Sequence, residues 1–146
     1  MKLFLMRHGQ AANPQVDPQQ GLTDKGKAQI EQLAKRLAGQ GIQFGQVLHS
    51  EKARAQQTAE IMASVLAPNI TVQMRTGLKP NDDPRLLLPE IERWQHDTLI
   101  TSHLPFVPSL LAELTNQPQN MGFVPGTIIC LSKEEGRWKV EWLESP

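Results

Sequence analysis

Short apolar runs and longer stretches of helical periodicity alternate along this chain. The first run, residues 2–6 (Lys-Leu-Phe-Leu-Met), is nearly continuous, which is typical of a strand buried on both faces of a parallel sheet. By the same reasoning, further strands are predicted at residues 46–49, 70–74, 97–101, 127–131 and 138–143. The last two form a closing hairpin, and we place Trp138, Val140 and Trp142 on one face of it because they alternate with other residues.

Between these strands, apolar residues recur three and four positions apart, as on one face of an amphipathic helix. One helix is predicted to begin after Thr23, which caps it, and to end at Gly39 and Gly41. Further helices are predicted at residues 51–66, at 84–94 and from Pro105 onward. Pro89 must kink or restart the helix at 84–94, because proline cannot continue a helix undisturbed.

The predicted elements alternate strand and helix until the final hairpin. This order predicts an α/β protein of three layers, α/β/α, with helices on both faces of a mostly parallel sheet and an antiparallel C-terminal hairpin. The 146 residues match the usual length of one domain and contain no internal repeat, so we expect a single domain, residues 1–146. In such sheets ligands bind at the carboxyl ends of the strands, where chemistry is therefore expected.

Charge and composition exclude several other classes of protein. The 15 basic and 15 acidic residues balance, whereas a general nucleic-acid binder or a polybasic membrane patch needs a large basic excess. No apolar run approaches the roughly 20 residues of a membrane span, and the apolar start is too short for a signal peptide. The single cysteine, Cys130, is interpreted as a small core residue. We expect a soluble, cytoplasmic protein that binds neither nucleic acid nor membrane.

Basic and imidazole side chains follow three of the predicted strands. The first strand ends on Arg7, His8 and Gly9, where the glycine would let a ligand approach the backbone closely. Arg54 lies in the first turn of a helix, where the dipole disfavours a cation unless an anion binds there too. His103 follows the fourth strand. Singly, these residues could be a surface turn, a solvated arginine and a packed histidine, but their meeting at one sheet edge favours a shared site.

These residue types suit phosphate chemistry. Two guanidinium groups bind phosphate oxygens through paired hydrogen bonds and stabilise the charge on a transferring phosphoryl group. A neutral imidazole is a competent nucleophile, so one histidine can attack while the other donates hydrogen bonds to the phosphoryl oxygens. No metal-ligand spacing such as HExxH is present, and we expect neither a metal nor a cofactor. His49, within a strand, is interpreted as structural, and His96 lies in a polar turn.

Several motifs together resemble the histidine phosphatase superfamily, whose fold is that of the phosphoglycerate mutases, and in particular its small bacterial branch, the SixA-type phosphohistidine phosphatases. The matching segments span essentially the whole chain and include residues 4–9 (FLMRHG), 22–23 (LT), 47–50 (VLHS), 54–58 (RAQQT), 78–80 (LKP) and 100–105 (ITSHLP). The resemblance implies that His8 is transiently phosphorylated and that Arg7, Arg54 and His103 complete a phosphate pocket. The spacing of the residues does not itself choose between His8 and His103 as the nucleophile.

Two departures from the family pattern bear on the reaction. Glu51 stands where relatives often have proline and brings negative charge near the pocket entrance. The acidic glutamate of the mutase branch has no counterpart after the third strand, where Asp82 and Asp83 are either possible acids or turn-forming and capping residues. A phosphohistidine leaves as imidazole, whose conjugate acid has a pKa of about 6.5, so it needs an acid less than an alkoxide does. A site without a dedicated acid therefore suits phosphorus–nitrogen substrates.

We therefore expect a metal-independent phosphatase that hydrolyses phosphohistidine on a protein, such as a phosphotransfer domain, through a phosphohistidine intermediate. Residues 75–96 are too few for the lid that larger relatives carry, and an open pocket admits a side chain of another protein. Two alternatives remain, a small-molecule phosphomonoesterase of the same superfamily and a non-catalytic module that binds phosphate. We expect the protein to act as a monomer.

Overall fold

The computed structural model describes residues 1–118 and 122–146. Strands and helices alternate until the final pair of strands, in the order expected from the sequence. The strands are β1 (Lys2–Arg7), β2 (Gln46–His49), β3 (Gln73–Met74), β4 (Thr98–Ser102), β5 (Ile128–Glu134) and β6 (Arg137–Glu144). The helices are α1 (Asp24–Gly39), α2 (Ala53–Leu66), the 3₁₀ helix η1 (Pro84–Leu87), α3 (Leu88–Ile91) and α4 (Phe106–Thr115).

The strands form one six-stranded sheet in the order β3-β2-β4-β1-β5-β6. β3, β2, β4 and β1 run parallel to one another, and β5 and β6 add an antiparallel hairpin beside β1. This arrangement confirms the predicted α/β class with its mostly parallel sheet. β1 lies inside the sheet, and its four residues from Leu3 to Met6 are all buried, as their continuous apolar run predicted.

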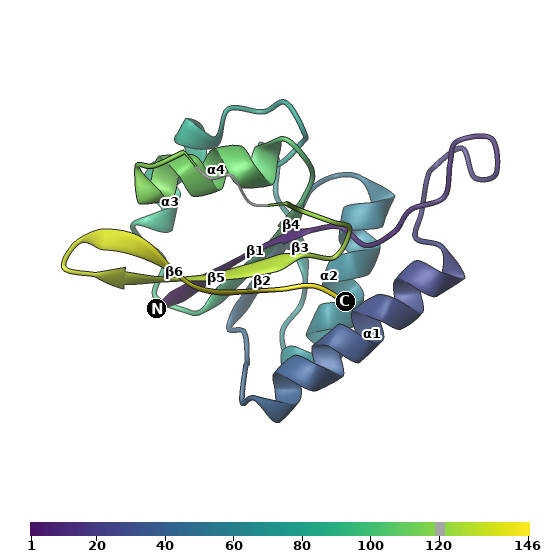
Figure 1. Ribbon diagram of the computed structural model, residues 1–146, viewed down its shortest axis with the longest axis horizontal. Coiled ribbons are helices and arrows are strands. Elements are labelled where there is room, and N and C mark those ends of the chain that lie inside the picture. The colour runs from purple at the N-terminus through teal and green to yellow at the C-terminus, as the bar shows by residue number, and fades with distance from the viewer. Residues whose placement is uncertain (119–121) are drawn as a thin grey trace.

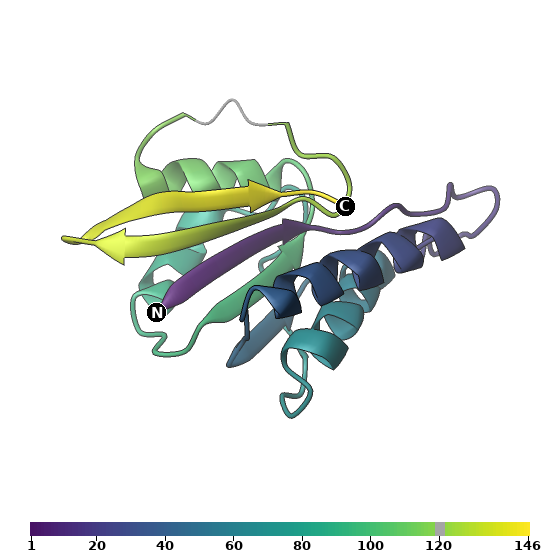
Figure 2. The same ribbon diagram turned by 60° about the horizontal axis from the view of Figure 1, so that its bottom comes forward.

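Helices cover both faces of this sheet, so the molecule has three layers. α1 and α2 lie side by side on one face, while α3 and α4 lie on the other (Figure 1; Figure 2). Each face has its own core: Phe4 packs with residues of α1 and α2, and its neighbour Leu5 packs with residues of η1, α3 and α4. Neighbouring side chains along a strand point to opposite faces, which explains how β1 serves both cores.

Helix α1 begins where the sequence predicts, and its start is tied to the loop after β1. Thr23 is the N-cap, and its hydroxyl accepts a hydrogen bond from the Gly26 N–H at 2.9 Å. Gly26 lies so close to Gln10 that a Cβ would come within 2.4 Å of the Gln10 carbonyl oxygen. The buried face of the helix contains Ile30, Leu33, Ala34 and Leu37. Cap and close contact together fix how the chain leaves the carboxyl end of β1.

The strand predicted at residues 70–74 is shorter than expected. β3 has two residues, which pair with Leu48 and His49 of β2. The chain before β3 turns instead of extending, because the Ile70 N–H donates to the Ala67 carbonyl at 3.0 Å. The sheet edge next to β2 is therefore only partly covered by a neighbouring strand.

The connection between β3 and β4 is also more broken than a single helix. The stretch predicted at 84–94 divides into η1 and α3, of four residues each, and ends at Ile91. Pro89 lies in the first turn of α3, so the helix restarts there, as one of the two predicted outcomes. α2 and α4 likewise begin one or two residues later than predicted, at Ala53 and Phe106. No helix in the described part of the chain is long and apolar enough to cross a membrane.

The prediction that Trp138, Val140 and Trp142 share one face of the hairpin is wrong. Cys130 of β5 pairs with Trp142, but the next residue of β5 pairs with Val140, so a β-bulge leaves Glu141 as an extra residue. The bulge shifts the alternation along β6. Trp138 and Val140 consequently pack in the core beneath α4, whereas Trp142 packs in the core beneath α1. Strand pairing, which the alternation of β6 alone does not reveal, causes the difference.

Candidate active site

The ends of three parallel strands meet at one edge of the sheet. β1 and β4 are paired to their last residues, and the His8 N–H donates to the Ser102 carbonyl at 3.0 Å. His8 and His103 therefore leave adjacent strands side by side, with ring centroids 5.3 Å apart. On the other side of β4, the chain after β2 is held by the Ser50 N–H, which donates to the Thr101 carbonyl at 3.2 Å. The predicted meeting of strand ends thus occurs.

One ring nitrogen of His8 is held, and the other has no hydrogen-bond partner among the described residues. Its Nδ1 lies 2.7 Å from the Gly9 carbonyl oxygen, and because a carbonyl can only accept, Nδ1 carries the hydrogen. Nε2 is left with its lone pair. Burial, together with the positive charges of Arg54 and Arg7, lowers the pKa of His8 to about 4. The imidazole is therefore neutral near pH 7, which is the form that a nucleophilic histidine needs.

His103 is more deeply buried, with 2% of its surface exposed. Its Nε2 lies 2.5 Å from the Ser50 hydroxyl oxygen. Burial, and then the proximity of His8 and Arg54, lower the pKa of His103 to about 3, so this ring is also neutral near pH 7. Its Nδ1 is buried, and no described residue forms a hydrogen bond with it. Since buried polar atoms normally have partners, Nδ1 is available to a ligand.

The positive charges of Arg7 and Arg54 both act on His8, where they help to lower the pKa. Arg7 Nη1 donates to the Phe123 carbonyl at 2.7 Å, which fixes its guanidinium, while its buried Nε has no hydrogen-bond partner among the described residues. Within the described ranges, neither arginine forms a salt bridge with a carboxylate. Two guanidinium groups that are not neutralised beside a neutral imidazole can bind a phosphoryl group.

Gly9 contacts two helices, whereas the sequence predicted that it would let a ligand approach the backbone. A Cβ at Gly9 would lie 2.9 Å from Ile30 Cγ1, so the absence of a side chain makes room for α1. The Gly9 N–H donates to Thr58 Oγ1 at 3.0 Å, and the Thr58 hydroxyl donates to the Arg54 carbonyl at 2.8 Å. The glycine therefore packs against α1 and is hydrogen-bonded to α2, and its N–H is not free to bind phosphate.

The two candidate acids both make local contacts. The Asp82 carboxylate accepts from the Lys79 N–H at 2.8 Å. Asp83 caps η1 by accepting from the Arg85 N–H at 3.0 Å, and it also pairs with the Arg85 guanidinium. These hydrogen bonds lower the pKa of Asp83, whereas a general acid at neutral pH needs a raised one. The contacts favour the turn and cap interpretation. Glu51 is exposed and precedes α2.

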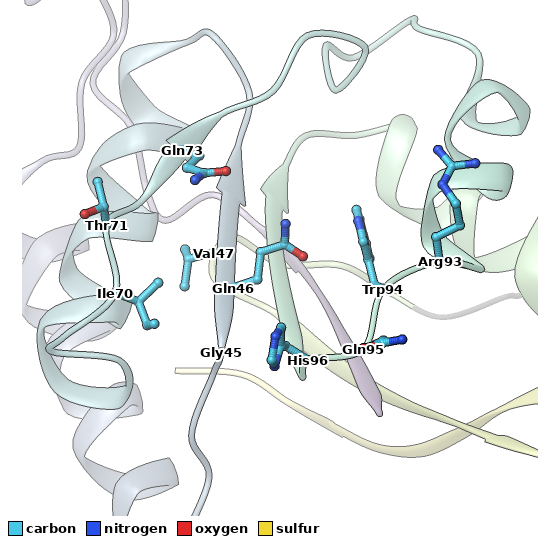
Figure 3. Close-up of a pocket in the computed structure, with 10 residues that line it drawn as sticks. All are labelled: Gly45, Gln46, Val47, Ile70, Thr71, Gln73, Arg93, Trp94, Gln95 and His96. Carbon is cyan, nitrogen blue, oxygen red and sulfur yellow. The ribbon is translucent and has the colours of Figure 1, made fainter.

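The remaining histidines and the cysteine lie apart from these groups. His49 is buried, and its Nδ1–H donates to the Ser50 carbonyl at 2.8 Å, which supports a structural role. His96 and Arg93 line a hollow of about 370 Å³ at the amino ends of β2 and β4, the edge opposite to His8 (Figure 3). Burial raises the pKa of the Cys130 thiol to about 11. In the described part of the chain, no cluster of His, Cys, Asp and Glu could hold a metal ion.

Sequence reasoning assigned no role to two hydroxyl groups that contact the site. The Ser50 hydroxyl contacts His103, and the Thr58 hydroxyl links Gly9 to the first turn of α2. The signal was present in the run Ser-x-x-x-Arg-Ala-x-Gln-Thr, where Arg54 and Thr58 are four residues apart and so share one face of a helix. The partner of each hydroxyl lies on another element and could not be identified from that run.

Comparisons with known proteins agree with this geometry. Residues 3–80 match the family model of the histidine phosphatase superfamily (branch 1). The chain is 30% identical to phosphohistidine phosphatase SixA of Escherichia coli (strain K12), in an alignment that covers 100% of this chain and 94% of that protein.

Solved structures extend the comparison to the fold. The structure of the protein histidine phosphatase SixA complexed with tungstate superposes with a TM-score of 0.86 at 31% identity, over 100% of this chain and 97% of that one. A phosphoserine phosphatase mutant from Entamoeba histolytica, in complex with phosphoserine, has a TM-score of 0.77 at 16% identity, over 97% and 95% of the two chains, and supports the fold alone. With a family model matching more than half of its length and a relative aligned along all of it, this chain belongs to the histidine phosphatase superfamily.

Proposed function

We propose that this protein hydrolyses phosphohistidine on other proteins through a phosphohistidine intermediate on His8. The observation that carries the proposal is a neutral His8 whose Nε2 has no hydrogen-bond partner among the described residues. It lies beside Arg7, Arg54 and the donor-capable ring of His103. The relationship to a phosphohistidine phosphatase along the full chain supports the choice of substrate. The solved structure of the protein histidine phosphatase SixA is a complex with tungstate, which is a tetrahedral oxyanion like phosphate.

In the first step, His8 Nε2 attacks phosphorus while the bond between phosphorus and the substrate imidazole breaks. The electron pair of that bond stays on the substrate nitrogen, so a ring that carries a hydrogen on its other nitrogen leaves as neutral imidazole and needs no further proton. Arg7 and Arg54 bind the phosphoryl oxygens, whose negative charge is spread over them in the transition state. Because the Phe123 carbonyl already holds the Arg7 guanidinium before substrate binds, little reorganisation of that group is needed. The product is a phosphorylated His8 and a free histidine on the partner protein.

In the second step, water attacks phosphorus and the bond to His8 Nε2 breaks. The electron pair returns to Nε2, and the phosphoryl group leaves with the water oxygen and its two hydrogens as dihydrogen phosphate. The hydrogen bond from Nδ1 to the Gly9 carbonyl persists through both steps and keeps Nε2 directed as the reacting nitrogen. His8 thus ends the cycle in the neutral form in which it began.

The contacts of Asp82 and Asp83 support a phosphorus–nitrogen substrate. Each carboxylate already accepts a backbone hydrogen bond, and Asp83 is also paired with Arg85. A sugar or serine phosphate would leave as an alkoxide and would need a well-placed acid. An imidazole leaving group, whose conjugate acid has a reference pKa of about 6.5, is stable as a neutral base near pH 7 and leaves without a general acid.

We further propose that the protein acts as a monomeric, cytoplasmic enzyme of one domain without a lid, and that it uses no metal ion or cofactor. The balanced charge of the chain supports an absence of nucleic-acid and membrane binding. The two four-residue helices between β3 and β4 support an open site, which a side chain displayed on a phosphotransfer domain can enter. Addition of a chelator should leave turnover unchanged, and sedimentation should report a single chain.

A side-by-side substrate comparison tests the proposal. The full chain is offered a phosphotransfer domain carrying phosphohistidine and a panel of aryl, sugar and serine phosphates, and kcat/KM is measured for each. We expect the highest kcat/KM for the phosphoprotein, together with an acid-labile phosphoenzyme that the His8→Ala variant does not form. A preference for a small ester would instead identify a phosphomonoesterase, and binding without turnover of any substrate would identify a phosphate-binding module.

A further inference from the structure

Ser50 and His103 are in contact, and both residues are buried at the ends of adjacent strands. Ser50 is fully buried, and its backbone N–H donates to the neighbouring strand at Thr101. His103 follows β4 directly and is also buried. The Ser50 hydroxyl oxygen and His103 Nε2 are 2.5 Å apart, so one of the two must donate a hydrogen to the other.

The surroundings of the Ser50 hydroxyl decide the direction of this hydrogen bond. The Lys52 N–H donates to the Ser50 oxygen at 3.3 Å, so a lone pair of that oxygen is already used. The hydroxyl hydrogen needs an acceptor, and among the described residues His103 Nε2 is the one that the Ser50 side chain contacts. Ser50 therefore donates and Nε2 accepts. A neutral imidazole carries one hydrogen, which must then be on Nδ1.

The opposite direction leaves two groups unsatisfied. If Nε2–H donated to Ser50, the serine hydrogen would have no acceptor in the described structure, at the cost that burial of an unpaired donor carries. Nδ1 would also present a lone pair beside His8, where the phosphoryl oxygens of a substrate carry negative charge. A lone pair there would repel those oxygens, whereas an N–H would bind them.

The sheet order explains how one ring can contact both neighbours. β4 lies between β2 and β1, so Ser50 approaches His103 from one side and His8 approaches it from the other. The ring nitrogen held by Ser50 is Nε2, and the nitrogen without a described partner is the buried Nδ1. We propose that Ser50 is a positioning residue that holds His103 as its Nδ1–H tautomer, so that His103 donates a hydrogen bond to the phosphoryl group that His8 receives. This inference rests on the proposed function of the same site.

Ring-nitrogen NMR of the ¹⁵N-labelled full chain tests the tautomer without any substrate. In the unmodified protein, we expect His103 Nδ1 to have the chemical shift of a protonated nitrogen and Nε2 that of an acceptor, while His8 has the same tautomer but with Nδ1–H bonded to Gly9. In Ser50→Ala, His103 should shift toward the Nε2–H form, which free imidazole side chains favour in water. Ser50→Thr keeps the hydroxyl and should retain the original tautomer.

Ser102→Ala is the matched control. Ser102 is another fully buried serine at a strand end, but its hydroxyl donates to the Leu78 carbonyl rather than to a histidine. It should leave the His103 tautomer unchanged. Loss of a group that fixes a catalytic histidine's tautomer costs as much as about 10⁴-fold in kcat in a serine protease. For the neutral Ser50 hydroxyl, we expect a smaller loss in kcat, about 10- to 100-fold, with a smaller change in KM and with rescue by Ser50→Thr.

The outcomes separate this inference from the proposed function. A His103 that carries its hydrogen on Nε2 in the unmodified protein, or that keeps Nδ1–H in Ser50→Ala, overturns the tautomer assignment whatever the substrate is. Titration with inorganic phosphate should shift the Nδ1–H proton of His103, and an unmoved signal at saturation overturns the donor role. Failure to hydrolyse phosphohistidine, with the tautomer and the phosphate shift intact, would contradict the substrate and leave the role of Ser50 standing.

Discussion

His8 and His103 are the same side chain at the ends of adjacent parallel strands, yet their surroundings make them chemically different. His8 is half-buried, and a backbone carbonyl holds its Nδ1. His103 is almost fully buried, and a serine hydroxyl holds its Nε2. Burial lowers the pKa of both rings well below 6.5, so both are neutral. The difference in role therefore comes from which ring nitrogen is occupied, and by what kind of group, rather than from charge.

Replacement of the two histidines in turn is the strongest test of this comparison. His8→Ala should abolish the phosphoenzyme and reduce kcat by about 10⁴- to 10⁶-fold, because the attacking atom is removed. His103→Ala should slow turnover but still form phosphoenzyme, since His8 Nε2 remains. His96→Ala, at the opposite sheet edge, is the control and should behave as the unmodified protein does. Phosphoenzyme formed by His8→Ala but not by His103→Ala would reverse the two roles.

Substitutions of Arg54 test whether the positive charge near both histidines contributes to kcat/KM. Arg54→Ala should reduce kcat/KM by about 10²- to 10³-fold, as loss of a group that stabilises transition-state charge does. Arg54→Lys should recover part of this, because lysine keeps the charge but not the paired donors. Arg93→Ala, at the opposite edge, removes the same charge and should have no effect. A loss below about tenfold would mean that Arg54 is a solvated helix residue.

The pH dependence tests the neutrality of the two rings. With the pKa of His8 at about 4, kcat/KM for an aryl phosphate should stay level from pH 8 to about 5.5 and fall as His8 protonates below that. A histidine with the ordinary pKa of 6.5 would already lose activity near pH 6.5. An inflection there, in the free enzyme, would contradict the burial of the His8 ring.

The same shifts predict how stability depends on pH. Between about pH 6.5 and 4 the unfolded histidines bind protons that the folded rings of His8 and His103 do not. The free energy of unfolding should therefore be greatest above pH 6.5 and should decrease as the pH falls through this window. Denaturant titrations of the unmodified protein and of His103→Ala check it, and the variant should show the weaker pH dependence.

The smallest effect is expected at the candidate acids. Asp83→Asn keeps a good helix cap and removes the carboxylate, so kcat/KM should stay within about twofold for phosphohistidine substrates. Asp82→Asn should behave alike, because its carboxylate holds a turn. A tenfold loss confined to phosphomonoesters, with a new dependence on pH, would identify one of them as a general acid for that class and would favour the phosphomonoesterase alternative.

Much of the fold could be predicted because its signals are local. The continuous apolar run of β1, the Thr23 cap of α1 and the Asp83 cap of η1 all depend on residues close together in sequence. The misplacement of Trp142 occurs where strand pairing decides the outcome, because the bulge at Glu141 moves Trp142 to the other face. β3 is short for a local reason, since the chain before it turns between Ala67 and Ile70.

The kinds of group at the site can be read from the sequence alone. So can the edge of the sheet where they meet, since parallel strands of an α/β fold bring their carboxyl ends together. The sequence identified Arg7, His8, Arg54 and His103 by residue type and motif. Which ring nitrogen of each histidine lacks a partner among the described residues depends on the fold, because that partner comes from the tertiary contacts. That choice depends on an oxygen a few ångströms away, which His8 finds in the next residue and His103 finds across the sheet on Ser50. The residue type allows each histidine to act as a nucleophile or as a hydrogen-bond donor, and the hydrogen-bond partner of one ring nitrogen decides which role the other nitrogen can take.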